Sequence, residues 1–147
     1  DVPVRAIQFV GQGLPIAEED RSCLGAGGPN SALGVNAVLG RRVWDQQAKF
    51  VLRMGPLGYG AFCDLLPSGT AFAPLVHLTW FLAGQECDFD VQLVLRAAEV
   101  PRCRLGETGP TAPRLGWSTW LKTRAFARDA DDTVLTGGLT ACTAFPG

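Results

Sequence analysis

Several residue types that build reactive or membrane-bound proteins are scarce in this chain of 147 residues. Histidine occurs once, and the five cysteines include no Cys-x-x-Cys pair, so a zinc site would need distant thiols brought together by the fold. No apolar run approaches the roughly 18 residues of a membrane-spanning helix. An odd number of cysteines also disfavours a disulfide framework. We therefore expect reduced thiols, no metal, no cofactor and a cytosolic protein.

Charge is also sparse, and its two signs are balanced. Thirteen basic and fourteen acidic residues give a formal net charge of −1, and the longest basic run is Arg41-Arg42. Binding to nucleic acid depends on clustered Lys and Arg, so no nucleic-acid partner is expected. In contrast, 47% of the residues are hydrophobic, and glycine and proline are frequent. Such a chain either buries its apolar surface within one domain or covers part of it with a partner.

The length fits a single domain spanning residues 1–147. The sequence starts at Asp1 rather than Met and shows no signal peptide, so we expect it to be part of a longer polypeptide. Glycine and proline in residues 137–147 predict a weakly ordered tail.

Alternating apolar and polar residues predict four strands, at residues 3–10, 49–54, 88–96 and 132–136. Gly55-Pro56 is expected to end the second strand, and residues 11–38 are expected to form a loop. The third strand has the clearest pattern, because its apolar side chains share one face: Phe89, Val91, Leu93 and Leu95.

Two helices are predicted in the middle of the chain, at residues 59–66 and 72–83. Thr70 is a candidate cap for the longer helix, and Gly84 follows its end. This helix is apolar nearly all round, so it should be covered by the sheet or by another subunit.

Two long segments of the chain share one irregular pattern. Residues 23–39 read CLGAGGPNSALGVNAVL, and residues 103–121 read CRLGETGPTAPRLGWSTWL. Each has Leu-Gly, two variable residues, Gly-Pro, a short spacer, a second Leu-Gly and a later Leu. A strand leads into and out of each loop, so the repeat units span about 3–54 and 88–136. We expect an α+β fold with a mainly antiparallel sheet, built from two strand–long loop–strand repeats with two helices between them.

Both repeated loops carry apolar side chains where a disordered linker would carry polar ones. Long loops in compact domains are usually functional or disordered. Apolar residues on irregular backbone suit docking into a partner's groove. The alternative is that these side chains fold back onto their own sheet. Two copies of one surface favour two copies of one partner. The apolar residues concerned are Leu33, Val35, Val38 and Leu39 in the first loop, and Leu115, Trp117, Trp120 and Leu121 in the second.

No catalytic motif is recognisable. His77 lies within the apolar helix, where a histidine is more often a core residue than a base, and Asp88 and Asp90 fit a solvated strand face. The alternative function is nevertheless a small hydrolase that uses His77 with Asp88 or Asp90. A third interpretation is a carbohydrate- or peptide-binding module that stacks ligands on exposed Trp117 and Trp120.

Two further motifs are poor matches to known sites. The acidic residues in RDADD lack the glycine and the later glutamate of an EF-hand loop. Gly-Gln-Gly at residues 11–13 is too short for a dinucleotide-binding fingerprint, and no helix pattern follows it.

Three long stretches resemble the C-terminal half of the TssG family, also known as ImpH or VasB, a baseplate subunit of the bacterial type VI secretion system. They read LGRRVWDQQAKFVLRMGPLGYGAFCDLLPSG, FDVQLVLRAAEVPRCRLG and PRLGWSTWLKTRAF followed by DADDTVL. The resemblance runs from about Val4 to Leu135. Gly58 stands where the family often has a helix-capping Ser, which is expected to weaken the start of the short helix by a few tenths of a kcal/mol.

The resemblance implies a structural, non-enzymatic role in a cytoplasmic baseplate docked at the inner membrane. In this family, one TssG binds two copies of TssF to form the wedge core, TssE joins them, and two extended loops each capture a TssK trimer. Carried onto this sequence, the loops assign a partner-binding role to Leu24, Gly28, Pro29, Leu33, Gly34 and Leu39, and to Leu105, Gly109, Pro110, Leu115, Gly116, Trp117 and Leu121.

Overall fold

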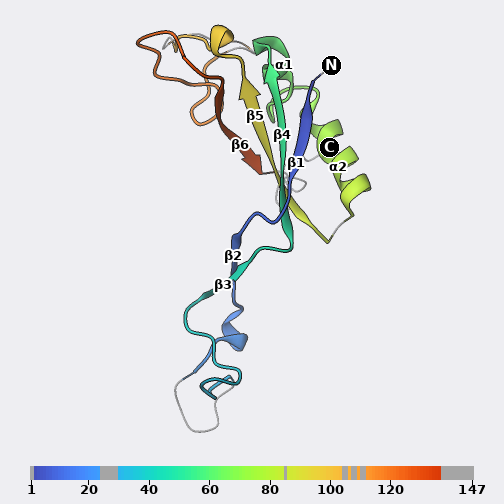
Figure 1. The fold of residues 1–147 in the computed structure, drawn as a ribbon, viewed down its shortest axis with the longest axis vertical. Coiled ribbons are helices and arrows are strands. Elements are labelled where there is room, and N and C mark those ends of the chain that lie inside the picture. The colour runs from blue at the N-terminus through green and yellow to red at the C-terminus, as the bar shows by residue number, and fades with distance from the viewer. Residues whose placement is uncertain are drawn as a thin grey trace.

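A computed structural model describes residues 2–23, 30–84, 86–103, 106, 109 and 112–136. Its main sheet has four strands in the order β1 (Val4–Ile7), β4 (Lys49–Leu57), β5 (Asp88–Leu95) and β6 (Ala130–Thr136). The pairs β1/β4 and β5/β6 are antiparallel, and the central pair β4/β5 is parallel. The predicted α+β class is confirmed. The parallel pair differs from the mainly antiparallel sheet that the sequence predicts. It arises because the helices form a crossover between β4 and β5 (Figure 1).

Two helices occupy this crossover: α1 (Tyr59–Asp64) and α2 (Phe72–Ala83). The bounds of α2 match the prediction, and Gly84 ends it with a φ of 80°. The predicted cap at Thr70 is wrong, because Ala71 occupies the N-cap position and no side chain caps the helix there. Among the described residues, no helix is both long and apolar enough to cross a bilayer.

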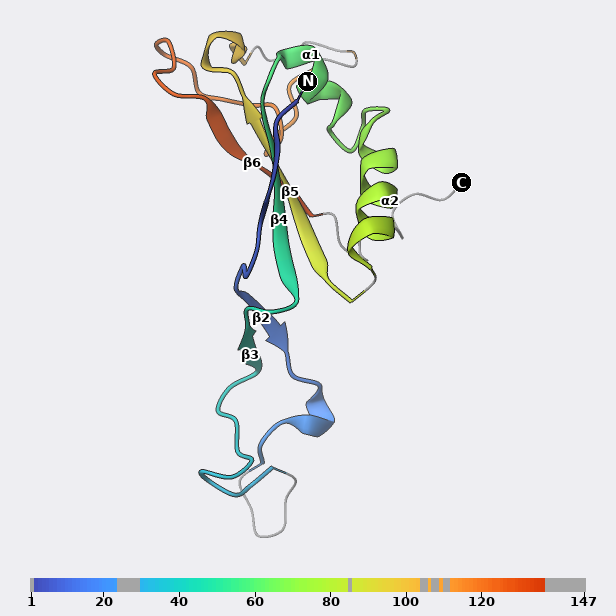
Figure 2. The ribbon, with the colours of Figure 1, turned by 45° about the vertical axis from the view of Figure 1, so that its right-hand side comes forward.

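The hydrophobic core lies between one face of the sheet and the two helices (Figure 2). The Trp80 ring of α2 meets the Phe89 ring of β5 edge-on, with 6.0 Å between centroids. The predicted inward face of the third strand is confirmed, because every residue of that set is fully buried. The largest fully buried side chains are Phe62, Phe89, Leu57, Leu93, Leu95 and Val91.

The opposite face of the sheet is polar. Lys49 on β4 forms an ion pair with Asp90 on β5, with 2.8 Å between Nζ and Oδ2. Further along, the Arg53 guanidinium donates to Gln92 Oε1 at 3.2 Å and to Asp131 Oδ2 at 3.0 Å. β5 thus separates a buried apolar face from one that carries Asp90 and Gln92, as the alternation predicted, with buried Val94 as the exception on the second face.

β4 does not end at Gly55-Pro56, and that prediction is wrong. The strand continues to Leu57 through a cis Gly55-Pro56 peptide, and its pairing with β5 shifts register between Met54 and Leu57. Gly55 has a φ of 127°, and a Cβ there would collide with the carbonyl oxygen of Val94. Glycine at position 55 therefore lets β4 approach β5 closely, and the strand continues past it.

A second, two-stranded sheet forms an arm that projects from the β1/β4 end of the molecule (Figure 1). It pairs β2 (Gln12–Pro15) with β3 (Arg42–Asp45) in antiparallel register. Part of the predicted loop 11–38 is therefore strand, and a short 3-10 turn, η1 (Glu18–Asp20), follows. The indole of Trp44 lies over Gly11, where any Cβ would overlap it.

A second 3-10 turn, η2 (Ala97–Glu99), follows β5 in the main body of the molecule.

Candidate functional site

The arm carries the first repeated loop at its far end, away from the core. Main-chain bonding continues past the strands, because Ile16 N–H donates to the Arg41 carbonyl at 2.9 Å. Side chains then hold the tip, since the Ser22 hydroxyl accepts from Val38 N–H at 2.8 Å. Asn30 Nδ2 also donates to the Asp20 carbonyl at 2.8 Å. Hydrogen bonds within the arm thus hold the described residues of this segment.

The second Leu-Gly of this loop forms a tight turn. The Ala32 carbonyl accepts from the N–H groups of Val35, Asn36 and Ala37, at 3.2, 3.1 and 3.1 Å. In return, Asn36 Oδ1 accepts from Ala32 N–H at 3.0 Å. Gly34 has a φ of 78°, a backbone angle that residues with a Cβ rarely adopt. Leu33, just before it, is 83% exposed.

The corresponding Leu-Gly of the second loop forms a turn with the same pattern of bonds. The Arg114 carbonyl accepts from Trp117 N–H at 3.1 Å and from Ser118 N–H at 2.9 Å. The Ser118 hydroxyl accepts from Arg114 N–H at 3.0 Å. Gly116 has a φ of 81°, and Leu115 is 93% exposed. The repeated letters thus correspond to a repeated local geometry.

The two turns differ in their support. The arm tip stands at one end of the molecule, whereas residues 112–129 lie beside the four-stranded sheet (Figures 1 and 2). The Thr133 hydroxyl of β6 donates to the Trp117 carbonyl at 2.9 Å. Trp120 is only 9% exposed and its ring lies 5.6 Å from the Phe62 ring. The second turn is therefore anchored to the core.

This anchoring changes the interpretation of the two tryptophans. Trp117 is partly buried against the core, with the Arg114 guanidinium 5.9 Å from its ring centroid. The ligand-binding module required both rings to be exposed, and the burial of Trp120 makes that interpretation wrong. Periodicity could not reveal this, because the loop backbone has no regular face.

The remaining residues assigned to partner binding fall into two groups. Leu39 and Leu121 are exposed, and Gly109 adopts a φ of 124°. The others lie outside the described residues, so their placement stays a prediction: Leu24, Gly28, Pro29, Leu105 and Pro110.

A further surface, which loop patterns did not indicate, lies along α2. Phe72, Val76 and Thr79 are buried, whereas Leu78, Phe81 and Leu82 of the same helix are exposed. An apolar pocket of about 420 Å³ lies between this helix and the sheet, lined by Val4, Phe50, Leu52, Leu75, Leu78, Thr79, Leu82 and Ala83. The sheet alone therefore does not cover the helix.

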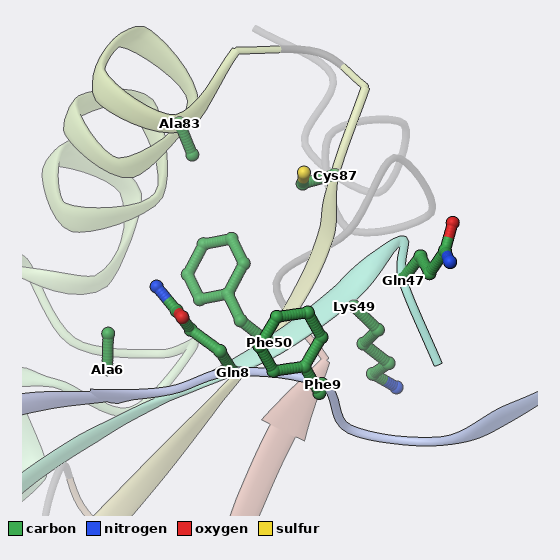
Figure 3. A pocket seen from close by; sticks show the side chains of 8 residues that line it. All are labelled: Ala6, Gln8, Phe9, Gln47, Lys49, Phe50, Ala83 and Cys87. Carbon is green, nitrogen blue, oxygen red and sulfur yellow. The ribbon is translucent and has the colours of Figure 1, made fainter. Parts of the chain in front are cut away.

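A second pocket, of about 430 Å³, lies where the arm joins the body (Figure 3). Phe50 points from β4 toward the space between Ala83 at the end of α2 and Cys87. Phe9 lines the pocket with a φ of 60°, unusual for an aromatic residue, at the point where β1 gives way to β2. This positive φ explains why the predicted strand 3–10 ends at Ile7.

The residues of the hydrolase alternative do not form a site in either pocket. His77 is exposed on α2, and Asp90 is paired with Lys49 on the polar face of the sheet. Neither pocket has His77, Asp88 or Asp90 in its lining. Among the described residues, no group of three or more His, Cys, Asp or Glu is placed to hold a metal ion.

Comparison with known proteins bears on this arrangement. The sequence matches the model of the family described as "Type VI secretion, TssG" over residues 1–122. No curated protein matches. A chain from the type VI secretion TssK–TssF–TssG baseplate subcomplex has the same fold, with a TM-score of 0.69 and 20% identity over 93% of this chain.

This chain covers 55% of that matched chain, so it spans about half its length. A chain from a type VI baseplate complex matches more weakly, with a TM-score of 0.49, 16% identity, and coverage of 92% of this chain and 36% of the other. With most of its length matched by the family model, the chain belongs to the TssG family of the type VI secretion system.

Proposed function

We propose that this chain is a structural, non-enzymatic component of the type VI baseplate wedge. It binds two copies of TssF, joins TssE, and recruits TssK trimers through its two repeated loops. It works in the cytoplasm, on the baseplate docked at the inner membrane. The observation that carries the proposal is the pair of matching turns, each presenting an exposed leucine at a separate place on one chain.

Two similar surfaces support recruitment of two copies of one partner. A loop that merely fills space would turn its apolar side chains inward, because burying a leucine contributes roughly 1.5–3 kcal/mol. Here Leu33, Leu39, Leu115 and Leu121 remain exposed although the core lies close to the second loop. The solved chain with the same fold comes from a baseplate subcomplex that also contains TssK and TssF.

The exposed side of α2 supports the TssF interface. A helix in a folded domain normally exposes polar residues, whereas this one exposes Leu78, Phe81 and Leu82 beside an apolar pocket. Contiguous apolar surface of this kind marks protein–protein contacts. We assign it to TssF because the two loops already account for TssK.

The test uses the full-length protein mixed with TssF and TssK, with the mass of the complex measured by light scattering after size exclusion. We expect two TssK trimers per TssG, and one when residues 24–39 are deleted. Two trimers retained after the deletion would refute the loop assignment. Loss of TssF on substituting Leu78 and Phe81 by Asp, with TssK binding unchanged, would separate the two interfaces.

A further inference from the structure

The two Leu-Gly turns are closed by the same reciprocal bonds, made by different side chains. In the arm, the Ala32 carbonyl accepts a hydrogen bond from Asn36 N–H, and the Asn36 side-chain amide oxygen accepts one from Ala32 N–H. In the second loop, Arg114 and Ser118 do the same, with a hydroxyl in place of the amide. An amide oxygen and a hydroxyl share one property here: each is an uncharged acceptor. The shared chemistry is therefore the acceptor rather than the residue type.

Some apolar side chains are exposed in both loops, and others are exposed in only one of them. At the corresponding positions after the glycine, Val35 is exposed and Trp117 is packed on the core. The leucines, in contrast, are exposed in both loops: Leu33 and Leu39 in the first, Leu115 and Leu121 in the second. A partner that meets both loops in the same way can contact only what both present. That common element is a pair of leucines.

We infer that each loop presents one docking element, an exposed leucine pair, and that Asn36 and Ser118 are positioning residues that hold its turn in the bound shape. The inference rests on the proposed function and states what the partner recognises. One partner copy would accept Leu33 and Leu39 in two apolar pockets, and a second copy would accept Leu115 and Leu121.

The arm should depend on its positioning residue more than the second loop does. Ser118 is buried and its neighbours Trp117 and Trp120 pack on the core, so that turn has a second source of order. Asn36 is exposed at the tip of the arm, where local hydrogen bonds are what orders the turn. A turn already fixed in its bound shape loses less conformational freedom on binding, and so binds more tightly.

The experiment measures TssK occupancy on the full-length TssG–TssF complex by native mass spectrometry across a TssK titration. Leu33→Asp should remove one trimer, Leu115→Asp the other, and the double variant both. Asn36→Ala should weaken one of the two sites about fivefold, the loss expected for one hydrogen bond. Asn36→Ser, which installs the acceptor of the second turn, should retain more of that affinity than Asn36→Ala.

Val134→Asp is the matched control, because Val134 is an exposed apolar residue on β6 outside both loops. It should leave two trimers bound. Two trimers on the double leucine variant, or equal affinity for wild type and Asn36→Ala, would overturn the inference while leaving loop recruitment intact. No TssK on the wild-type complex would instead refute the proposed function itself. Loss of both trimers from one single leucine variant would also overturn the inference, because independent elements fail one at a time.

Discussion

The carboxylate of Glu99 accepts a hydrogen bond from the backbone N–H of Tyr59, with 2.7 Å between Oε2 and N. Tyr59 is the first residue of α1, and Gly58 at its N-cap offers no side-chain acceptor. A helix start leaves its first N–H groups without internal partners. Glu99, which follows β5, therefore supplies a side-chain acceptor at this helix start. It binds the first N–H of the helix, whereas a Ser at position 58 would bind the second or third, and it offsets part of the weakening expected from Gly58.

Replacing Glu99 by Ala should lower the free energy of unfolding by about 1 kcal/mol, the usual value of a helix cap. Urea unfolding of the full-length protein, followed by tryptophan fluorescence, measures the difference. Asp132→Ala, at an exposed position on β6, serves as the control and should change little.

A second substitution tests the same relationship from the other side. A Cβ at Gly58 would lie 3.1 Å from Glu99 Oε2, so Gly58→Ser should gain nothing in the wild-type protein. In the Glu99→Ala background the crowding is gone, and the serine should recover most of the lost stability. Additive effects of the two changes would contradict this interpretation.

Gly55→Ala should destabilise the sheet severely, by roughly 2 kcal/mol or more, because it combines a positive φ with a clash against the Val94 carbonyl. Gly60→Ala is the matched control. Gly60 lies in α1 with open space around its missing Cβ, so alanine should stabilise the helix by about 0.5–1 kcal/mol. Thermal unfolding of both variants measures the contrast, and similar shifts for the two would refute it.

Cys63 should react slowly with thiol reagents. Burial raises the pKa of its thiol above the ordinary 9.0; a hydrogen bond with Tyr59 lowers it, and the Asp64 charge raises it further. Cys23 and Cys103 are exposed. At about pH 8, iodoacetamide should therefore label Cys23 and Cys103 first, because the thiolate is the reacting form. Peptide mapping by mass spectrometry reads the order, and equal labelling of Cys63 and Cys23 would contradict the prediction.

The same shift has a definite sign for stability. The folded state disfavours the Cys63 thiolate relative to the unfolded state, so its contribution is fully present below the ordinary thiol pKa. That contribution is lost as the pH rises through the raised value. Cys63→Ala should flatten this alkaline decline, measured as the free energy of unfolding against pH.

Phe81→Asp should weaken TssF binding at least tenfold and leave folding nearly unchanged. Phe81 is 84% exposed on α2, so the free energy of unfolding should shift by about 0.5 kcal/mol or less. Phe62→Ala, in the core, should cost roughly 3–5 kcal/mol instead. Co-purification with TssF and circular dichroism distinguish the two effects. Normal TssF binding by Phe81→Asp would remove α2 from the proposed interface.

Long periodic elements were predictable from the sequence, since their patterns reflect one buried face. The bounds of α2 and the inward residues Phe89 and Leu93 of β5 are examples. The arm was not predictable, because β2 and β3 expose most of their residues and show no alternation of burial. The path of β4 through Gly55-Pro56 depends on the neighbouring β5 backbone, which lies distant in the sequence.

The candidate site was predictable only in part. The repeated Leu-Gly letters located both turns and the exposed Leu33 and Leu115. They did not show that Trp117 and Trp120 pack on the core, because the partners of these rings come from other elements. Nor did they indicate Asn36 and Ser118, two different residues whose equivalence appears only in their hydrogen bonds.

The arm joins the body through the paired strands β2 and β3, so the length of the arm can change independently of the main sheet. Gln12 pairs with Asp45 and Pro15 with Arg42, so the outgoing and returning chains stay side by side. Paired residues of an antiparallel ladder lie about 5 Å apart. A two-residue turn would therefore suffice to close the ladder after Pro15. Each added residue pair would extend it by about 3.3 Å without altering the main sheet. The spacing between the two proposed docking points can thus change by insertion or deletion in the arm, while the fold of the body stays the same.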